Sequence, residues 1–301
     1  MRRKIPSTAA LIAFEMAARH ESFTRAAEEL ALTQSAVCRQ IASLEEFVGL
    51  RLFKRTRRGV KLTEAGLSYS RQIGARLDAV ERDTLSLMAH HGKGVTLELG
   101  VVPTFATRWL IPRLASFHAA HPEIVLNFAT RTRPFMFSEH ELDAAIYYGD
   151  AVWPGTEAHF LMYEDSVPVC SPKLLNGRQS LTAAEIATLP LLQQTTRPYA
   201  WRSWFESLGM RIEHDMTGIR MELFSMLAQA AIEGMGVALM PPFLIREELD
   251  RGQLVVPFNH ACPSSKAYYL MIPEHMVESV ALQAFRAWLC EEARRYREIG
   301  A

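Results

Sequence analysis

The sequence predicts a chain in two structural parts: an all-α N-terminal head with a β-hairpin wing and a long helix, and then a two-lobed α/β domain. Helical periodicity with short connections dominates residues 1–90, whereas strands alternate with amphipathic helices from residue 95 onward. Charge divides the chain in the same way. Residues 1–62 contain 12 Lys and Arg against 6 Asp and Glu, although the 301-residue chain has a formal net charge of zero. A basic head on an acidic body indicates a polyanionic partner for the head.

The head is predicted to contain three helices followed by a hairpin. Apolar residues recur at steps of three and four, and they predict helices over residues 7–19, 24–30 and 34–47. Thr33 is a good N-cap for the third helix. Two strand-like segments at 52–55 and 60–63 flank a basic turn in which Gly59 permits a positive φ. Residues 1–63 therefore read as a winged helix-turn-helix.

The third helix has two contrasting faces. With about 3.6 residues per turn, Val37, Ile41 and Leu44 share one side and are expected to pack inward. The opposite side is small and polar, and it carries Ser35, Cys38, Arg39 and Ala42, with Gln34 at the helix start. Such a face can enter the major groove of DNA, where arginine hydrogen-bonds base edges or phosphates.

A polar outer face is also ordinary for any small three-helix domain, so the hairpin provides the second argument. Its basic residues are expected to contact the DNA backbone and to supply affinity without sequence information. We therefore predict that DNA contacts come from Thr33, Gln34, Ser35, Cys38, Arg39, Arg55, Arg57 and Arg58.

A long helix is predicted over residues 64–90, with Thr63 as its cap. A mostly apolar seam repeats along it at alternating steps of three and four, and consists of Ser70, Ile73, Leu77, Val80, Thr84 and Leu87. A seam of this period suits pairing with a second copy of the chain, and the alternative is a solitary helix packed on its own head. We expect this linker and dimerisation helix to occupy residues 64–91.

The remainder, residues 92–301, is predicted to form two lobes with mostly parallel sheets. A polar, glycine-containing linker is expected at 90–94. The predicted strands cover 95–102, 124–130, 144–148, 166–170, 190–194, 219–222, 236–240, 254–258 and 267–272. The predicted helices lie near 105–119, 201–208, 225–234, 243–250 and 277–298.

The segments TQSAVCRQIASLE and LFKRTRRGVKLTEAG resemble the N-terminal domain of LysR-type transcriptional regulators. The resemblance covers the whole chain. It implies a regulator that binds double-stranded promoter DNA as a homodimer or homotetramer, that responds to a small molecule, and that contacts RNA polymerase. Cys38 departs from the family, in which serine is usual, so it can change base preference or expose the head to oxidation.

The second part resembles the regulatory domain of the same family, which shares its fold with periplasmic solute-binding proteins. VVPTFATRWLIPRLASFHAAHPEI and DAAIYYGDAVWPG look like the branch with the activators of glycine cleavage and of β-lactamase expression. The resemblance implies one lobe of residues 95–163 and 266–301, and another of 164–265. The crossover between them is expected at Glu164-Asp165.

Hydroxyl-bearing residues follow three predicted strands, where α/β folds bind ligands, although each can be an ordinary helix cap. Together with the family resemblance, they predict effector contacts at Thr104, Phe105, Tyr147, Thr196, Ser225 and Tyr268. Related members often carry arginine in place of Tyr147. The effector is therefore expected to be an amino acid or small carboxylate, or a larger and mostly neutral molecule.

Several other residues are given structural roles. The four cysteines lack metal-ligand spacing, and His118 and His121 are expected on the polar face of a helix, so no metal or other cofactor is predicted. Trp201, Trp204 and Phe205 recur at helical spacing and are expected in the core.

The sequence also bears on two other function classes. A solute-binding protein or a sensor without a transcriptional role has no use for the basic head, and the N-terminus lacks the apolar stretch of an export signal. An enzyme is not expected, since none of the common catalytic motifs occurs. No apolar run approaches the length that spans a membrane, so a cytoplasmic protein is predicted.

Overall fold

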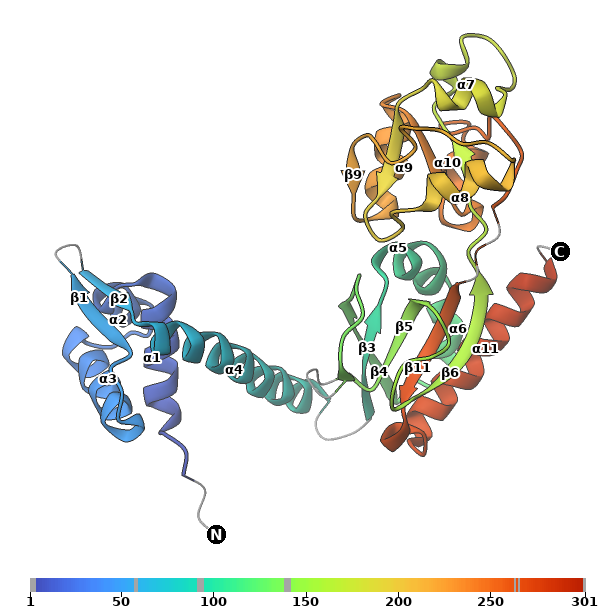
Figure 1. Cartoon of the computed structure of the whole chain (residues 1–301). Coiled ribbons are helices and arrows are strands. Elements are labelled where there is room, and N and C mark those ends of the chain that lie inside the picture. Colours follow the sequence, from blue (N-terminus) through green and yellow to red (C-terminus); the bar gives the residue numbers. More distant parts are fainter. Residues whose placement is uncertain are drawn as a thin grey trace. The chain divides into compact units, whose positions relative to one another are not determined.

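The computed structural model describes residues 4–56, 59–90, 95–137, 142–262, 264 and 266–299. The chain forms two compact units, Met1–Lys93 and Gly94–Ala301. Figure 1 shows the helical head with its long helix as one unit and two α/β lobes as the other. The described residues contain no helix with the length and apolarity that a membrane span requires.

The head consists of α1 (Thr8–His20), α2 (Phe23–Glu29) and α3 (Gln34–Val48) around one core. Each helix begins at a hydroxyl N-cap, as predicted for Thr33, whose Oγ1 accepts a hydrogen bond from the Ala36 N–H at 3.2 Å. Val37, Ile41 and Leu44 are fully buried or nearly so, which confirms the inward face of α3. They pack with Phe14 and with the alanines of α1 and α2, whose small side chains let the helices approach closely.

The wing is the antiparallel hairpin of β1 (Phe53–Thr56) and β2 (Gly59–Leu62), in which Thr56 pairs with Gly59. Gly59 has a φ of +128°, as the sequence predicted. The hairpin is followed directly by α4 (Glu64–His90), which Thr63 caps through the Gly66 N–H at 3.0 Å. Gly66 is required here, because a Cβ would lie 2.1 Å from the carbonyl oxygen of Leu52.

The second unit contains two sheets in two lobes. The first is a five-stranded sheet with the order β4-β3-β5-β11-β6. Its strands are β3 (Val95–Val101), β4 (Ile124–Thr130), β5 (Ala144–Gly149), β6 (Thr156–Tyr163) and β11 (Ala267–Pro273). It is covered by the irregular helical run Pro103–Ala120 and by α11 (Val280–Ile299).

The second sheet has the order β7-β10-β8-β9. Its strands are β7 (Val167–Val169), β8 (Leu191–Gln194), β9 (Arg220–Met221) and β10 (Val237–Met240). The helices of this lobe are α7 (Ala183–Ala187), α8 (Ala200–Ser207), α9 (Phe224–Ile232) and α10 (Arg246–Asp250). Trp201, Trp204 and Phe205 are buried in its core, as predicted. The chain passes between the sheets twice, from β6 to β7 and from β10 back to β11.

Parallel strand pairs are the majority in this unit, as predicted, but antiparallel pairs also occur. In the described sheets of this unit, four strand pairs are parallel and three are antiparallel. Every antiparallel pair involves β6, β7 or β11, the strands that carry the chain between lobes. Strands β7 and β11 enter their sheets from the other lobe, and β6 follows β5 through a short connection before the chain leaves the first lobe. None of the three follows a helical crossover, so the βαβ rule does not fix their direction.

Some element predictions failed, and helix α7 (Ala183–Ala187) was not predicted. The segment 254–258 forms only an isolated bridge between Val255 and Cys170. Strand β6 was not predicted, because Thr156–Tyr163 mixes Glu157 and His159 with apolar residues and shows no clean alternation. The predicted helix at 105–119 exists as a continuous run, but it includes a π segment, Ala106–Leu110, and a 3₁₀ turn, Ile111–Arg113. Pro112 has no N–H to donate, which accounts for the altered turn.

Candidate functional site

The outer face of α3 is open to solvent. Thr33, Gln34, Ser35 and Arg39 are exposed, and Cys38 is half-buried. No described residue forms an ion pair with Arg39, so its guanidinium is available to a partner. The predicted contact residues on α3 therefore share one accessible face, opposite the buried Val37 and Ile41.

Glu45, which the sequence analysis did not single out, fixes the wing to α3. Its Oε1 accepts hydrogen bonds from the backbone N–H groups of Leu52 at 2.7 Å and Phe53 at 3.1 Å, and its Oε2 accepts one from Arg51 at 2.7 Å. Burial alone would raise the pKa of Glu45, but these donors lower it below its ordinary value of 4.5. Arg57, Arg58 and the side chain of Arg55 lie outside the described residues.

In the second unit, a small cavity of about 20 Å³ lies between the two lobes. Its lining includes Thr104, Tyr147 and Thr196 from the predicted effector contacts, together with Gln194 and Arg197. Two hydrogen bonds join the lobes beside it. The Ser225 N–H donates to Thr104 Oγ1 at 3.3 Å, and Thr132 Oγ1 donates to Glu222 Oε1 at 2.7 Å. Thr104 therefore caps α9, the first helix after β9, from the opposite lobe.

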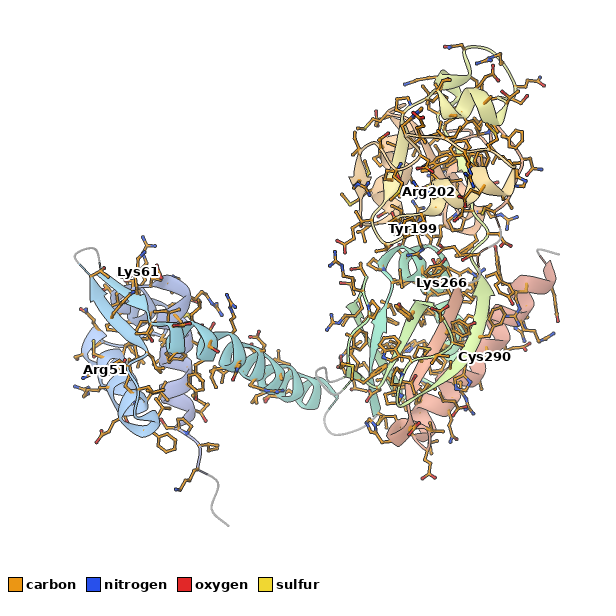
Figure 2. The ribbon with its side chains drawn as sticks, viewed as in Figure 1. Arg51, Lys61, Tyr199, Arg202, Lys266 and Cys290 are labelled. Carbon is orange, nitrogen blue, oxygen red and sulfur yellow. The ribbon has the colours of Figure 1, made fainter. Side chains whose placement is uncertain are left out.

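A larger cavity of about 290 Å³ adjoins the two crossings between the lobes. It shares Tyr148, Gln194, Thr196, Arg197 and Phe224 with the small cavity, so these residues form the wall between the two. Its lining also includes Tyr199 from the second lobe and Lys266 from the returning crossing; both are labelled in Figure 2.

A buried ion pair between Glu164 and Arg197 forms part of the lining of the larger cavity. Arg197 donates to both oxygens of Glu164, at 2.7 and 2.9 Å, and Tyr268 donates to Glu164 Oε2 at 2.5 Å. The guanidinium also lies 3.5 Å from the centroid of the Tyr148 ring. Glu164 is on the first crossing, Arg197 follows β8 in the second lobe, and Tyr268 is on β11 in the first lobe. This network therefore connects both lobes to the segment where the chain crosses between them, the hinge.

Burial and the Glu164 carboxylate shift the pKa values of Arg197 and of the two tyrosines near it. Burial and the nearby Glu164 carboxylate raise the pKa of Tyr268 well above 10 and that of Tyr148 to about 12. Burial opposes the charge on Arg197, but the Glu164 carboxylate outweighs it and raises the Arg197 pKa. The two tyrosines therefore stay neutral, and Arg197 stays positively charged, across the physiological pH range.

The remaining predicted effector residues lie behind the cavities or beside them. Tyr268 and Phe105 are fully buried and stack on one another with a centroid distance of 4.6 Å, and neither is among the residues that line the two cavities described above. Ser225 is exposed and contributes its backbone N–H, while its neighbour Phe224 lines both cavities. The Tyr147 ring packs over Gly149 and against Trp153, 4.9 Å between centroids, where a Cβ on Gly149 would not fit.

Sequence reasoning missed Gln194, Arg197 and Lys266. Gln194 ends β8 immediately before the predicted Thr195-Thr196 pair, and Arg197 follows that pair, so the same strand-end argument could have found both. Lys266 had no local signal, because its position depends on how the returning crossing passes the cavity.

Each of the two units matches a known protein family. Residues 8–67 match the family described as bacterial regulatory helix-turn-helix protein, lysR family, and residues 90–294 match the LysR substrate binding domain. The chain belongs to the LysR family. The predicted family and fold class are confirmed, and this LysR-type transcriptional regulator joins a DNA-binding helix-turn-helix to an effector-binding α/β domain.

Individual relatives agree with the predicted branch. The LysR-type chain is 39% identical over 299 residues to the glycine cleavage system transcriptional activator of Escherichia coli K12, covering 99% of this chain and 97% of that protein. It is 36% identical over 285 residues to the transcriptional activator AmpR of Pseudomonas aeruginosa, covering 94% and 95%.

A solved structure of a related domain is also similar to the second unit. It is the effector binding domain of a Citrobacter freundii protein containing three amino acid substitutions, of threonine to valine, serine to alanine and tyrosine to phenylalanine. It has a TM-score of 0.60 and 28% sequence identity to this LysR-type regulator, and the match covers 66% of this chain and 98% of that domain.

Proposed function

We propose that this regulator recognises promoter DNA through the exposed face of α3, and that a small molecule bound between the lobes modulates its activity. One observation carries the DNA assignment. Gln34, Ser35 and Arg39 lie exposed on the side of α3 opposite its buried face. A helix of this kind places its N-terminal residues against base edges, and its N-terminus favours a nearby phosphate.

The regulator is proposed to bind DNA as a dimer or a dimer of dimers. Of the predicted seam residues of α4, Val80 is 59% exposed and Thr84 is exposed, while Ile73 and Leu77 are half-buried. Exposed apolar side chains at this spacing suit a partner helix. A twofold-symmetric dimer carries two copies of α3, so its site is expected to be roughly palindromic.

The effector is proposed to be an amino acid or a small carboxylate. Thr104, Thr196 and the α9 N-terminus at Ser225 surround the small cavity with hydroxyl and N–H groups. The Citrobacter freundii domain was changed at a threonine, a serine and a tyrosine, the residue types of Thr104, Ser225 and Tyr268. Effector binding would shift the balance between arrangements of the lobes, and hence of the attached heads.

The proposal assigns no catalysis to the chain, since its relatives are transcriptional regulators and its activity requires binding alone. A protein whose target is promoter DNA acts in the cytoplasm of a bacterium. Contact with RNA polymerase would follow from activation, the role named for both relatives above.

The first prediction concerns Arg39. Arg39→Ala is expected to weaken binding to the regulator's own promoter fragment by about 5- to 100-fold, equivalent to about 1–3 kcal/mol. Fluorescence anisotropy at fixed salt measures this, with unrelated DNA of equal length as the reference. Arg71→Ala, an exposed arginine on α4, is the matched control. Equal affinity of Arg39→Ala and wild type would remove the recognition role from this face.

The second prediction concerns Thr104. Thr104→Val removes the acceptor of the Ser225 N–H and keeps the side-chain shape. We expect promoter affinity without effector to stay within about twofold of wild type, while the change in affinity on adding effector is reduced at least about tenfold. Thr107→Val, an exposed threonine three residues on, is the control. An unchanged response would separate Thr104 from the effector site.

A further inference from the structure

We infer that the larger cavity holds the body of the effector, and that this effector is an amino acid with an apolar side chain. This inference rests on the proposed function, because it names the ligand and its compartment within the proposed effector site. It follows from the size, the wall and the unused polar groups of the larger cavity.

The size of the two cavities decides which of them can hold a ligand. The small cavity, about 20 Å³, has room for about one water molecule. The inter-lobe hydrogen bonds of Thr104 and Thr132 close it further, so a ligand could enter only if they broke. The larger cavity, about 290 Å³, is near the lower end of the range for small-molecule sites, roughly 300–1,000 Å³.

The wall of the larger cavity is predominantly apolar and aromatic. Its apolar and aromatic residues include Tyr148, Leu192, Tyr199, Trp201, Phe224 and Leu239. Trp201 and Phe224 are fixed in the packed core of the second lobe, so this part of the wall is preformed. A wall of this kind binds an apolar side chain, because both surfaces leave water on contact.

The charges that line the cavity favour one anionic group. Glu164 and Arg197 neutralise one another through their two-point contact. Lys266 is exposed at the cavity, and no described carboxylate lies within ion-pairing distance of its ammonium. Its backbone N–H, by contrast, is held by Ser264 Oγ at 3.1 Å. The free cation is therefore placed to bind a carboxylate.

A buried acceptor in the cavity wall indicates the second polar group of the ligand. Gln194 is only 7% exposed and lines both cavities. Its Nε2 donates to Thr196 Oγ1 at 3.1 Å and to the Glu222 carbonyl at 2.8 Å, whereas its Oε1 has no hydrogen-bond partner among the described residues. A buried acceptor without a donor is costly, by about 1–3 kcal/mol, so a ligand N–H donor relieves it. A ligand that offers a carboxylate to Lys266 and an N–H donor to Gln194 has the two polar groups of an amino acid.

The test uses the full-length protein and defined probes. The apolar L-amino acids leucine, isoleucine, methionine, phenylalanine and tryptophan are titrated by calorimetry and thermal unfolding. The tightest is then compared with its decarboxylated amine and with its deaminated acid. We expect the intact amino acid to bind at least about tenfold more tightly than either analogue, because each analogue leaves one polar group of the site unmatched.

Variants locate the compartment. Ser203→Leu adds bulk in the larger cavity only, and Ser203 is exposed on α8, so the fold is expected to tolerate it. It should weaken amino acid binding at least about tenfold. Lys266→Met should weaken binding of the amino acid and of the deaminated acid but not of the amine. Lys173 is an exposed lysine elsewhere in the same lobe as Ser203, and Lys173→Met should leave the binding of all three ligands unchanged.

The outcomes separate this inference from the proposed function. Binding that is lost in Thr104→Val but unaffected by Ser203→Leu and Lys266→Met would overturn the inference and leave the proposed effector site in place. The same holds if the deaminated acid binds as tightly as the amino acid, or if no amino acid binds. Failure of the proposed function would instead show as no preference for promoter DNA by the wild-type protein.

Discussion

At the scale of single residues, the buried polar groups have specific partners. Glu45 is 9% exposed and is satisfied by two backbone N–H groups and one guanidinium, which connects α3 to the start of the wing. Glu164 in the second unit is 3% exposed and is satisfied by Arg197 and Tyr268. In each case a carboxylate joins segments that packing alone would leave free to shift.

The prediction at this scale concerns Glu45. Glu45→Gln keeps the side-chain shape but removes the charge that the wing donors stabilise, so the head should lose about 1–3 kcal/mol of unfolding free energy at pH 7. Because folding lowers the Glu45 pKa, this contribution is complete above the unfolded value near 4.5 and disappears as the pH falls through the lower folded value. Urea unfolding at pH 7 and pH 3 measures both effects.

The neighbouring Glu46→Gln serves as the control, since Glu46 is exposed. Its unfolding free energy should match that of wild type at both pH values. If Glu45→Gln and Glu46→Gln unfolded alike at pH 7, the wing would not depend on the Glu45 hydrogen bonds.

At the scale of elements, α4 combines two kinds of surface. Its first turns pack on the head through Ala65 and Tyr69, and the Tyr69 ring lies 5.5 Å from that of Phe14. Further along, Val80, Leu85 and Met88 are exposed apolar residues. The side chain of Leu87, the last residue of the predicted seam, lies outside the described residues. A helix with an exposed apolar stripe is stable when a second surface covers it.

The prediction for α4 is a change in oligomeric state. Val80→Glu places a charge in the seam and should raise the dimer dissociation constant by at least about tenfold, because a desolvated carboxylate without a partner is unfavourable. Ser68→Glu introduces the same charge on the opposite, exposed side of α4 and is the control. Sedimentation velocity across a concentration series measures the dissociation constant. Identical sedimentation of the two variants would favour the solitary helix that the sequence left open.

At the scale of the whole molecule, the two lobes of the second unit contact one another at the hinge and also at a second place away from it. Arg108, in the π segment of the first lobe, forms an ion pair with Glu248 of α10 in the second lobe and lies 3.7 Å from Glu247. Phe105 contacts Phe243 of the second lobe at 6.2 Å between centroids. These contacts favour the closed arrangement of the lobes, since opening would expose Phe243 and separate the ion pair.

The prediction at this scale is a double-mutant cycle. Glu248 is 6% exposed, so Arg108→Met leaves a buried carboxylate without its partner and should lower the unfolding free energy by about 1–3 kcal/mol. Adding Glu248→Gln should recover part of this loss, because the unpaired charge is removed. Chemical denaturation of the full chain measures the cycle. Additive effects of the two substitutions would show that the pair contributes no coupling.

The sequence predicted most of the head and less of the second unit. The helices of the head were predicted to within a residue or two, because Thr33 and the buried side of α3 are signals read within one element. Strand β6 and the direction of β11 were not, since a strand without alternation is specified by its neighbours in the sheet. Of the predicted effector residues, Thr104, Tyr147 and Thr196 line a cavity, whereas Tyr268 lies in the core behind it.

The sequence by itself determined the family, the two-part organisation and the outward face of α3, because periodicity, helix caps and charge are properties of short segments. Only the tertiary structure decided which strand ends meet, that Glu164 pairs with Arg197, and that the cavity beside Lys266 is large while the one beside Thr104 is closed. These features depend on contacts between residues 33 to 121 positions apart, such as Glu164 with Arg197 and Thr104 with Ser225. Packing of the complete fold fixes such distances, and local pattern does not.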